Sequence, residues 1–320
     1  MKRFKNISLW VLLVFSVLLL ITVGSFYRSE LPVSELEADY FTPQSRYIQL
    51  SDAKLHIRQR GSGPHVLLIH GSFSSLHTWA AWEDSLAQKY NTVSVDLPGH
   101  GLTGPSISQV YTLDQYANLM FELADSLKWN RFFVAGNSMG GGVSWKMALK
   151  DPERIRGMVL VDAVGDMRFT DENGKSVKPM IFKMIENKII AKAFTRLSPR
   201  FFTKMNMNEV FYDKQKITPE LVDRYYLLLR REGNRDATVK RINQTQTQDM
   251  SGLKNLKTPT LIIWGKEDRW IPLGTADRFL ELMPHAQLEV FENAGHVPME
   301  EIPAETVQPV MRFLDNFKNE

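Results

Sequence analysis

The stretch FFVAGNSMGGG at residues 132–142 decides the fold. Its first four residues are apolar and suit a buried strand, and a helical pattern begins directly after Ser138. The two are joined by GNSMG at residues 136–140, a G-x-S-x-G turn. Glycine at both flanks of such a turn lets the strand and the helix approach closely, and the central serine takes a strained backbone conformation. We therefore expect the Ser138 hydroxyl to project at the carboxyl end of the strand as a candidate nucleophile.

Strand and helix patterns alternate on both sides of this turn. Continuous apolar runs with short links to amphipathic helices are typical of parallel strands that are covered on both faces. A hairpin pattern at residues 47–60 precedes them. The sequence therefore predicts an α/β fold with a doubly wound, mostly parallel sheet. The apolar runs are HVLLIH at 65–70, NTVSVD at 91–96, GMVLVDAV at 157–164 and TPTLIIWG at 258–265.

The alternation stops between residues 165 and 252. This part is rich in Met, Phe, Ile and Tyr at helical spacing, and no strand of the earlier kind occurs in it. An insertion that leaves the carboxyl edge of a sheet passes over the site at that edge. We therefore expect a helical cap at 165–252 rather than a peripheral insertion, on a core formed by 46–164 and 253–320.

The N-terminal region reads as a targeting segment followed by a tether. Lys2, Arg3 and Lys5 precede an uncharged, apolar span at residues 6–27. This pattern predicts a membrane anchor at 1–28 whose basic end stays in the cytoplasm, so the catalytic body lies on the extracytoplasmic side. The alternative is a signal peptide cut after about Gly24, which gives a secreted or periplasmic protein. Residues 29–45 are acidic and are interpreted as a tether.

Composition excludes several classes of protein. The net charge of +3 is small and dispersed, so nucleic acid is not an expected partner. The chain has no cysteine, which excludes a thiol nucleophile, thiolate metal sites and disulfides. The 43% hydrophobic content is that of an ordinary globular protein. Nothing in these totals predicts an oligomeric state.

A serine nucleophile needs a base, and the base needs an anion that fixes its tautomer. His296 follows the last predicted strand and is the candidate base. Asp268 follows the penultimate strand and is the first candidate for the acid, because the order serine, acid, histidine places the acid late in the chain. Asp162, at the end of the strand after Ser138, is the reserve. Glu267 is next to Asp268 and should point the other way.

Two backbone N–H groups are candidates for an oxyanion hole. Met139 opens the helix after the turn, where free donors and the helix dipole favour an anion. The second donor is assigned to Ser72 in the HGSF loop at 70–73, with Phe73 as the close alternative. His70 precedes the nucleophile in the chain and is interpreted as a residue that organises this loop. The candidate substrate-binding residues are Phe73, Trp270 and Val297.

Five motifs in register resemble the α/β-hydrolase fold family. They are HGS at 70–72, DLPGHG at 96–101, GNSMGG at 136–141, WGKEDRWIP at 264–272 and NAGHVPMEE at 293–301. The resemblance runs from about residue 46 to the C-terminus. It implies an eight-stranded sheet, a helical cap and a triad of Ser138, Asp268 and His296, with no metal and no organic cofactor.

The resemblance also narrows the chemistry. Family members that resemble dehalogenases and epoxide hydrolases carry Asp where this chain has Ser138. GNSMGG and VFYDKQKITPELV at 210–222 look like the meta-cleavage-product hydrolases, which split a carbon–carbon bond. Those enzymes typically have a Gly-Pro-Gly loop where this chain has HGSFSS, and Trp where it has Val297. The expected function is a membrane-tethered serine esterase or lipase for small esters with an apolar acyl group. A carbon–carbon bond hydrolase and a non-catalytic ligand-binding protein are the alternatives.

Overall fold

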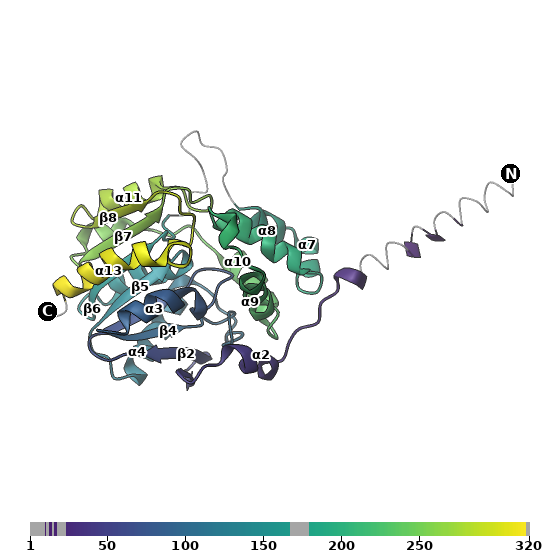
Figure 1. Ribbon diagram of the computed structural model, residues 1–320, viewed down its shortest axis with the longest axis horizontal. Coiled ribbons are helices and arrows are strands. Elements are labelled where there is room, and N and C mark those ends of the chain that lie inside the picture. The colour runs from purple at the N-terminus through teal and green to yellow at the C-terminus, as the bar shows by residue number, and fades with distance from the viewer. Residues whose placement is uncertain (1–9, 11–12, 15, 18–23, 167–178, 318–320) are drawn as a thin grey trace.

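A mostly parallel sheet forms the centre of the molecule, as the computed structural model in Figure 1 shows; the structure describes residues 10, 13–14, 16–17, 24–166 and 179–317. The sheet has eight strands in the order β1-β2-β4-β3-β5-β6-β7-β8. β2 is antiparallel to β1 and β4, and every other neighbouring pair is parallel. The fold class predicted from the sequence is confirmed. The strands are β1 (Ser45–Gln49), β2 (Lys54–Arg60), β3 (His65–Ile69), β4 (Asn91–Val95), β5 (Phe132–Asn137), β6 (Ile155–Val161), β7 (Thr260–Gly265) and β8 (Gln287–Phe291).

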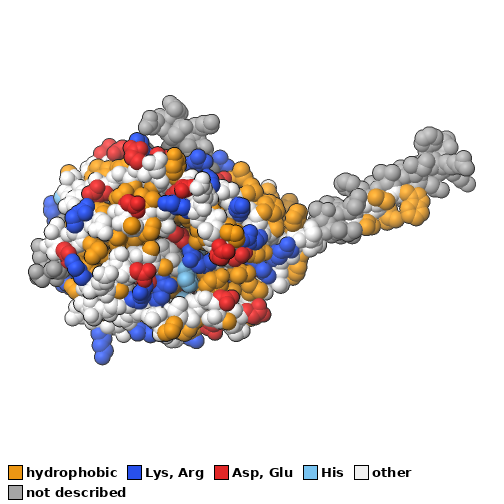
Figure 2. Space-filling model, viewed as in Figure 1, with side chains coloured by type: hydrophobic (Ala, Val, Ile, Leu, Met, Phe, Trp, Pro, Cys, Tyr) orange, Lys and Arg blue, Asp and Glu red, His pale blue; other side chains and the backbone are white. Residues whose placement is uncertain are grey.

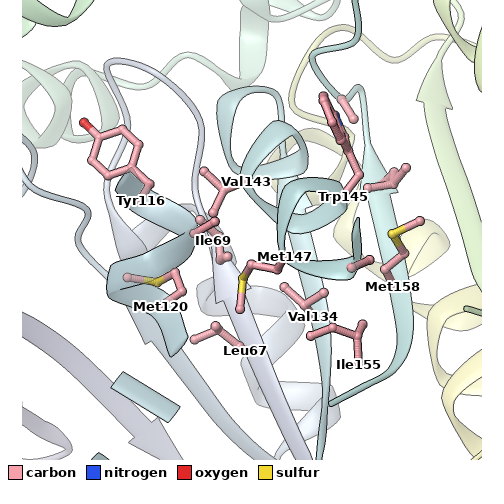
Figure 3. Packing of buried hydrophobic residues seen from close by; sticks show 14 of the residues in the cluster. Leu67, Ile69, Tyr116, Met120, Val134, Val143, Trp145, Met147, Ile155 and Met158 are labelled. Carbon is pink, nitrogen blue, oxygen red and sulfur yellow. The ribbon is translucent and has the colours of Figure 1, made fainter. Parts of the chain in front are cut away.

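Helices cover both faces of the sheet, which is why the central strands are apolar throughout. Leu67 and Ile69 of β3 pack against one helical layer, and Val66 and Leu68 pack against the other. Figure 3 shows the first layer, in which Met120 and Val143 lie over the strands. The first layer contains α4 (Leu113–Ser126), α5 (Met139–Lys150) and α11 (Gly274–Leu282), and the second contains α3 (Ala80–Leu86) and α13 (Pro303–Phe317).

Helices fill the described part of the chain between β6 and β7. In Figure 1, α7 to α10 gather at one side of the sheet. Cap side chains such as Phe182 and Met207 belong to the same buried cluster as the strand residues Val159 and Val161. The helices are α6 (Met180–Glu186), α7 (Lys188–Phe194), α8 (Arg200–Val210), η2 (Lys214–Lys216), α9 (Pro219–Leu229), α10 (Asn234–Gln244) and η3 (Ser251–Asn255).

Short helices occupy the remaining connections. The segment interpreted as a tether contains α2 (Val33–Tyr40), whose Leu36 is buried against Leu102 and Leu228. The backbone of Leu31 also bonds to the segment after α9, accepting from Glu232 N at 2.9 Å. The segment is therefore packed on the cap. The other connections hold η1 (Leu76–Trp79) and α12 (Pro298–Glu301).

The prediction of a membrane anchor needs correction. A helix needs about 20 consecutive apolar residues to cross a bilayer. In the part of the chain that the structure describes, no helix is long and apolar enough to do so, and the longest one, α13, has 15 residues. Most of the predicted span at 6–27 lies outside the described residues. The membrane-anchored, extracytoplasmic placement expected from that span is therefore not retained.

Charged side chains of both signs are interspersed over the face shown in Figure 2, in keeping with the net charge of +3. Hydrophobic side chains gather on the cap side of this face. Several cap residues contribute exposed apolar groups. They are Met180, Ile189, Phe201, Met205 and Tyr212.

Candidate active site

Ser138 lies on a strained turn between β5 and α5. Its φ is 53° and its ψ is −116°, a region that residues with a side chain rarely adopt. The neighbouring backbone fixes this conformation. Ser138 N donates to Val161 O at 2.9 Å, and Ser138 O accepts from Gly142 N and Val164 N at 3.0 Å. Such strain persists only where the surrounding structure determines it, and it is concentrated at functional sites.

Two glycines make this turn possible. A Cβ at Gly136 would lie 2.1 Å from Gly140 O, and a Cβ at Gly140 would lie 2.1 Å from Ile69 O. Both distances are far below van der Waals contact, so any side chain would separate α5 from the strands. The spacing of the G-x-S-x-G motif thus has a direct steric cause.

His296 and Asp268 form a buried pair at the ends of adjacent strands. Asp268 follows β7, His296 follows β8, and His296 Nδ1 lies 2.7 Å from Asp268 Oδ2. Asp268 Oδ1 accepts from Trp270 N at 2.7 Å and from Ile271 N at 3.0 Å. Both carboxylate oxygens are therefore held, and the pairing leaves Nε2 as the available nitrogen of the imidazole.

The His296 loop is bound to the nucleophile turn. Asn137, the residue before Ser138, donates from Nδ2 to His296 O at 3.0 Å, and His296 N donates to Val210 O of the cap at 2.8 Å. Nε2 of His296 is buried. Neither this nitrogen nor the Ser138 hydroxyl has a hydrogen-bond partner among the described residues. A serine mechanism pairs the hydroxyl with the imidazole nitrogen. Here both groups lie on adjoining segments, and both are without a hydrogen bond to the described residues.

Asp162, the reserve acid, lies beside this pair but does not bond to the imidazole. It is fully buried at the end of β6, and its Oδ1 accepts from Gly265 N at 3.0 Å. Burial, and then the charge of Asp268, raise the pKa of Asp162 well above its usual range. The protonated form of Asp162 is therefore favoured, and His296 takes Asp268 as its partner.

Among the described residues, Asp162, Asp268 and His296 are also a group of side chains that could ligate a metal ion. One ligand atom from each lies within 4.8 Å of the others. Nδ1 of His296 and Oδ2 of Asp268 already bond to each other. A cation would have to replace that pairing, so we assign these residues to proton chemistry.

The two residues predicted to supply oxyanion donors line the same cavity. Met139 is the first residue of α5, where N–H groups have no acceptor within the helix. The Ser72 Oγ lies 3.7 Å from Met139 Sδ, so the HGSF loop adjoins the start of α5. Within the described residues, no acceptor is found for the N–H of Ser72 or of Met139.

His70 holds the loop that carries Ser72. Its Nε2 accepts from Leu97 N at 3.0 Å, so the ring proton is on Nδ1, which lies 2.7 Å from Gly71 O. Burial lowers the pKa of His70, which favours the neutral ring. Both nitrogens are occupied, and this supports the interpretation of His70 as a loop-organising residue.

A cavity of about 280 Å³ opens beside Ser138. Four of the predicted site residues line this cavity. Phe73 is not among the lining residues, but its ring packs against two that are, with centroid distances of 6.0 Å to Phe182 and 6.3 Å to Trp270. Val297 is buried in the same hydrophobic cluster. The residues that line the cavity are Ser72, Ser138, Met139 and Trp270.

Sequence reasoning missed the cap residues of this cavity. Phe182 of α6, Arg241 of α10 and the polar run at 244–249 all line it. One arginine on an amphipathic helix gives no sequence signal. The sequence QTQTQ at 244–248 could have indicated these residues, because an uncharged polar run between a helix and a strand is unusual in a packed insertion.

The comparisons with known proteins agree with the fold. A family model described as alpha/beta hydrolase fold matches residues 64–303. The chain belongs to the α/β-hydrolase family. It is 30% identical over 259 residues to the pimeloyl-[acyl-carrier protein] methyl ester esterase of Nitrosomonas europaea, covering 80% of this chain and 97% of the relative. It is 31% identical over 254 residues to a 2-hydroxy-6-oxononadienedioate/2-hydroxy-6-oxononatrienedioate hydrolase of Pseudomonas putida, covering 77% and 86%.

Solved structures give the same fold. The crystal structure of a membrane phospholipase A matches this α/β-hydrolase with a TM-score of 0.74 at 24% identity over 100% of both chains, a likeness of fold alone. A meta-cleavage product hydrolase from Pseudomonas fluorescens IP01 matches with a TM-score of 0.72 at 25% identity, covering 85% of this chain and 97% of that one. The relatives in sequence are hydrolases, and both ester and carbon–carbon bond cleavage occur among them.

Proposed function

We propose that this α/β-hydrolase is a serine hydrolase of small carboxylic esters, with Ser138 as nucleophile, His296 as base and Asp268 as the acid that orients it. The observation that carries the proposal is the buried 2.7 Å pair of His296 and Asp268, whose free Nε2 adjoins the strained Ser138 turn. A serine hydroxyl becomes a nucleophile only when an oriented base takes its proton.

The reaction follows from these positions. His296 Nε2 takes the proton of Ser138, whose Oγ attacks the ester carbonyl carbon. The tetrahedral intermediate collapses when His296 returns the proton to the departing alkoxide, which leaves as the alcohol. A water molecule, deprotonated by His296, then attacks the acyl-enzyme, and the acid leaves as Ser138 regains its proton.

The backbone of Ser72 and Met139 stabilises the negative oxygen in both tetrahedral intermediates. Preorganised donors of this kind contribute about 3–4 kcal/mol each in a water-poor site. Ser72 and Met139 both line the cavity, and no acceptor for either N–H is found among the described residues. The Ser72 assignment is separable from the Phe73 alternative, because Phe73 does not line the cavity.

The acyl group is proposed to pack on the apolar wall of the cavity. Trp270, Phe182 and Ile271 form this wall, and the Trp270 ring centroid is 5.4 Å from that of His296. A volume of about 280 Å³ is at the lower end of the range for small-molecule sites. Short or compact esters are therefore the expected substrates.

Carbon–carbon bond cleavage is the second candidate, because relatives with that activity match the chain as well as the esterase does. Val297 follows the base in this chain where those enzymes typically carry Trp. A panel of p-nitrophenyl esters, set against a ring-cleavage dienoate, separates the two activities. Faster turnover of the dienoate would replace ester hydrolysis with carbon–carbon bond cleavage.

The test of the nucleophile is covalent labelling. A fluorophosphonate probe should modify the protein at Ser138, and Ser138→Ala should abolish both labelling and ester hydrolysis. Mass spectrometry of the labelled peptide identifies the site. The absence of an adduct on the folded wild-type protein would favour a non-catalytic ligand-binding role.

A further inference from the structure

Arg241 is a buried cation for which no hydrogen-bond or ion-pair partner is found among the described residues. It lies on α10, lines the cavity beside Ser138 and is only 4% exposed. Its Nε and Nη2 are buried and unbonded. In the described part of the chain, no hydrogen bond or ion pair reaches any of its three side-chain nitrogens. The ring of Phe73 lies beside it, with 5.7 Å between the guanidinium carbon and the ring centroid, and Tyr116 is near enough to act on the pKa of Arg241.

Other buried arginines of this protein are paired. Arg58 forms an ion pair with Glu83 at 2.6 Å. Arg235, on the same helix as Arg241, donates to Ser198 Oγ at 3.1 Å and to Arg28 O at 2.9 Å. The fold thus provides partners for guanidinium groups elsewhere, and the lack of one at Arg241 is particular to the cavity.

The charges around Arg241 do not compensate it. His70 and His100 lie close to Arg241. Burial lowers the pKa of both rings, and the charge of Arg241 lowers it further, so both rings are neutral. Two carboxylates line the cavity. Asp114 pairs with Lys146 at 3.2 Å and is largely exposed, and Asp249 accepts from Ser251 N at 2.8 Å. Neither bonds to Arg241.

An unpaired buried charge is costly, because burial removes its hydration and nothing replaces it. A guanidinium does not escape this cost by losing its proton. Groups that violate local rules without structural compensation are expected at functional sites. The compensation for Arg241 is therefore expected to come from a molecule that enters the cavity.

We propose that Arg241 binds a carboxylate of the substrate, so that the natural esters are half-esters of small dicarboxylic acids or esters of hydroxy acids. This rests on the proposed ester hydrolase. The guanidinium carbon lies 5.7 Å from the ring centroid of Phe73, the residue after Ser72, so we expect a short spacer between the carboxylate and the scissile ester. Bidentate pairing of a guanidinium with a carboxylate supplies the missing hydrogen bonds. The polar residues at 244–248 border the same space.

The experiment compares charged and neutral esters. Monoethyl succinate, glutarate and adipate are each matched with an ethyl ester in which an isopropyl group replaces the carboxylate, and acid release is followed in a pH-stat. The wild-type protein should prefer one of the charged esters. Arg241→Met should reduce the ratio of kcat/KM for charged over neutral ester by about 100-fold, as expected when one partner of a buried charge pair is removed. Arg241→Lys should retain part of the preference.

A matched control is the next residue on α10. Lys240 is exposed and bonds to Gln109, so Lys240→Met removes a positive charge from the same helix outside the cavity. Its charged-to-neutral ratio should equal that of the wild type. An equal fall in Lys240→Met would assign the preference to long-range attraction and overturn the proposal.

Binding is also measured without catalysis. Glutarate should raise the unfolding temperature of the wild-type protein and of Lys240→Met, but not that of Arg241→Met. Arg241→Met should itself be at least as stable as wild type, because it removes an unpaired buried charge. A less stable Arg241→Met with an unchanged ester ratio would show that the guanidinium serves packing on Phe73.

The two proposals fail in different ways. Hydrolysis of the neutral esters without a preference for any charged one overturns the carboxylate site and leaves the ester hydrolase standing. No ester hydrolysis and no labelling of Ser138 overturns the ester hydrolase, and the glutarate shift then decides the carboxylate site alone.

Discussion

Asp162 and Asp268 end neighbouring parallel strands of one sheet, yet their surroundings differ. Asp268 accepts from two backbone N–H groups and pairs with His296. Asp162 accepts from one N–H, that of Gly265, and shares a side-chain hydrogen bond with Asp268, which helps to raise the pKa of Asp162. The comparison teaches that position at the strand end does not decide the role of a carboxyl group. The number of donors around it does, because donors replace the water lost on burial.

The largest effect that sharpens this comparison is expected from Asp268→Asn. The amide keeps the shape of the side chain but cannot accept the Nδ1 proton in the same way, so His296 loses its tautomer and orientation. Ester hydrolysis should fall by about 10³- to 10⁴-fold in kcat, measured with saturating p-nitrophenyl butyrate. Full activity in this variant would move the acid role away from Asp268.

The second effect concerns stability and pH. The pKa of Asp162 is raised in the folded state. At pH values between the ordinary Asp pKa and this raised pKa, the folded protein therefore keeps a proton that the unfolded chain has lost. The contribution of Asp162 to stability is therefore complete at acid pH and is lost as pH rises through that window. Asp162→Asn removes the titration and keeps an acceptor for Gly265. It should be more stable than wild type by about 1–3 kcal/mol at pH 8, and the difference should shrink toward pH 4.

Urea unfolding of both proteins at pH 4, 6 and 8 measures this difference. Asp84→Asn is the control, because that carboxyl group is exposed. A gap between wild type and Asp162→Asn that stays constant with pH would contradict the assignment of a protonated Asp162.

The smallest effect is expected on catalysis in the same variant. An amide at position 162 resembles the protonated acid, so Asp268 keeps a neutral neighbour and His296 keeps its partner. The kcat of Asp162→Asn should stay within about tenfold of wild type, a change that stays well below the effect of removing the acid of a triad. Loss of activity equal to that of Asp268→Asn would show that the two carboxyl groups act as one unit.

Much of the fold follows from local sequence. The apolar runs at β3 and β5 and the G-x-S-x-G turn predict a parallel sheet and its reactive edge, because covered strands and sharp turns have compositions of their own. Chain order alone ranked Asp268 above Asp162. It could not reveal that Asp162 lies beside the pair, since that depends on the contact of β6 with β7.

The cap shows where sequence reasoning stops. Arg241 occupies a helical position like any other, and only the fold reveals that no acceptor among the described residues reaches it. Val297, predicted to bind substrate, is buried and is not among the residues that line the cavity, so its role stays a prediction. The anchor prediction was wrong for a different reason. No helix in the described part of the chain is long and apolar enough to cross a membrane, and most of the apolar run at 6–27 lies outside that part.

Asn137 has a further consequence for the working enzyme. Its side-chain amide bonds to His296 O at 3.0 Å and to Val161 O at 3.2 Å. The segments that bear the nucleophile and the base are thus clamped to the same strand. We therefore expect thermal excursions of the two segments to be coupled, so that the distance between Ser138 and His296 varies less than the position of either segment.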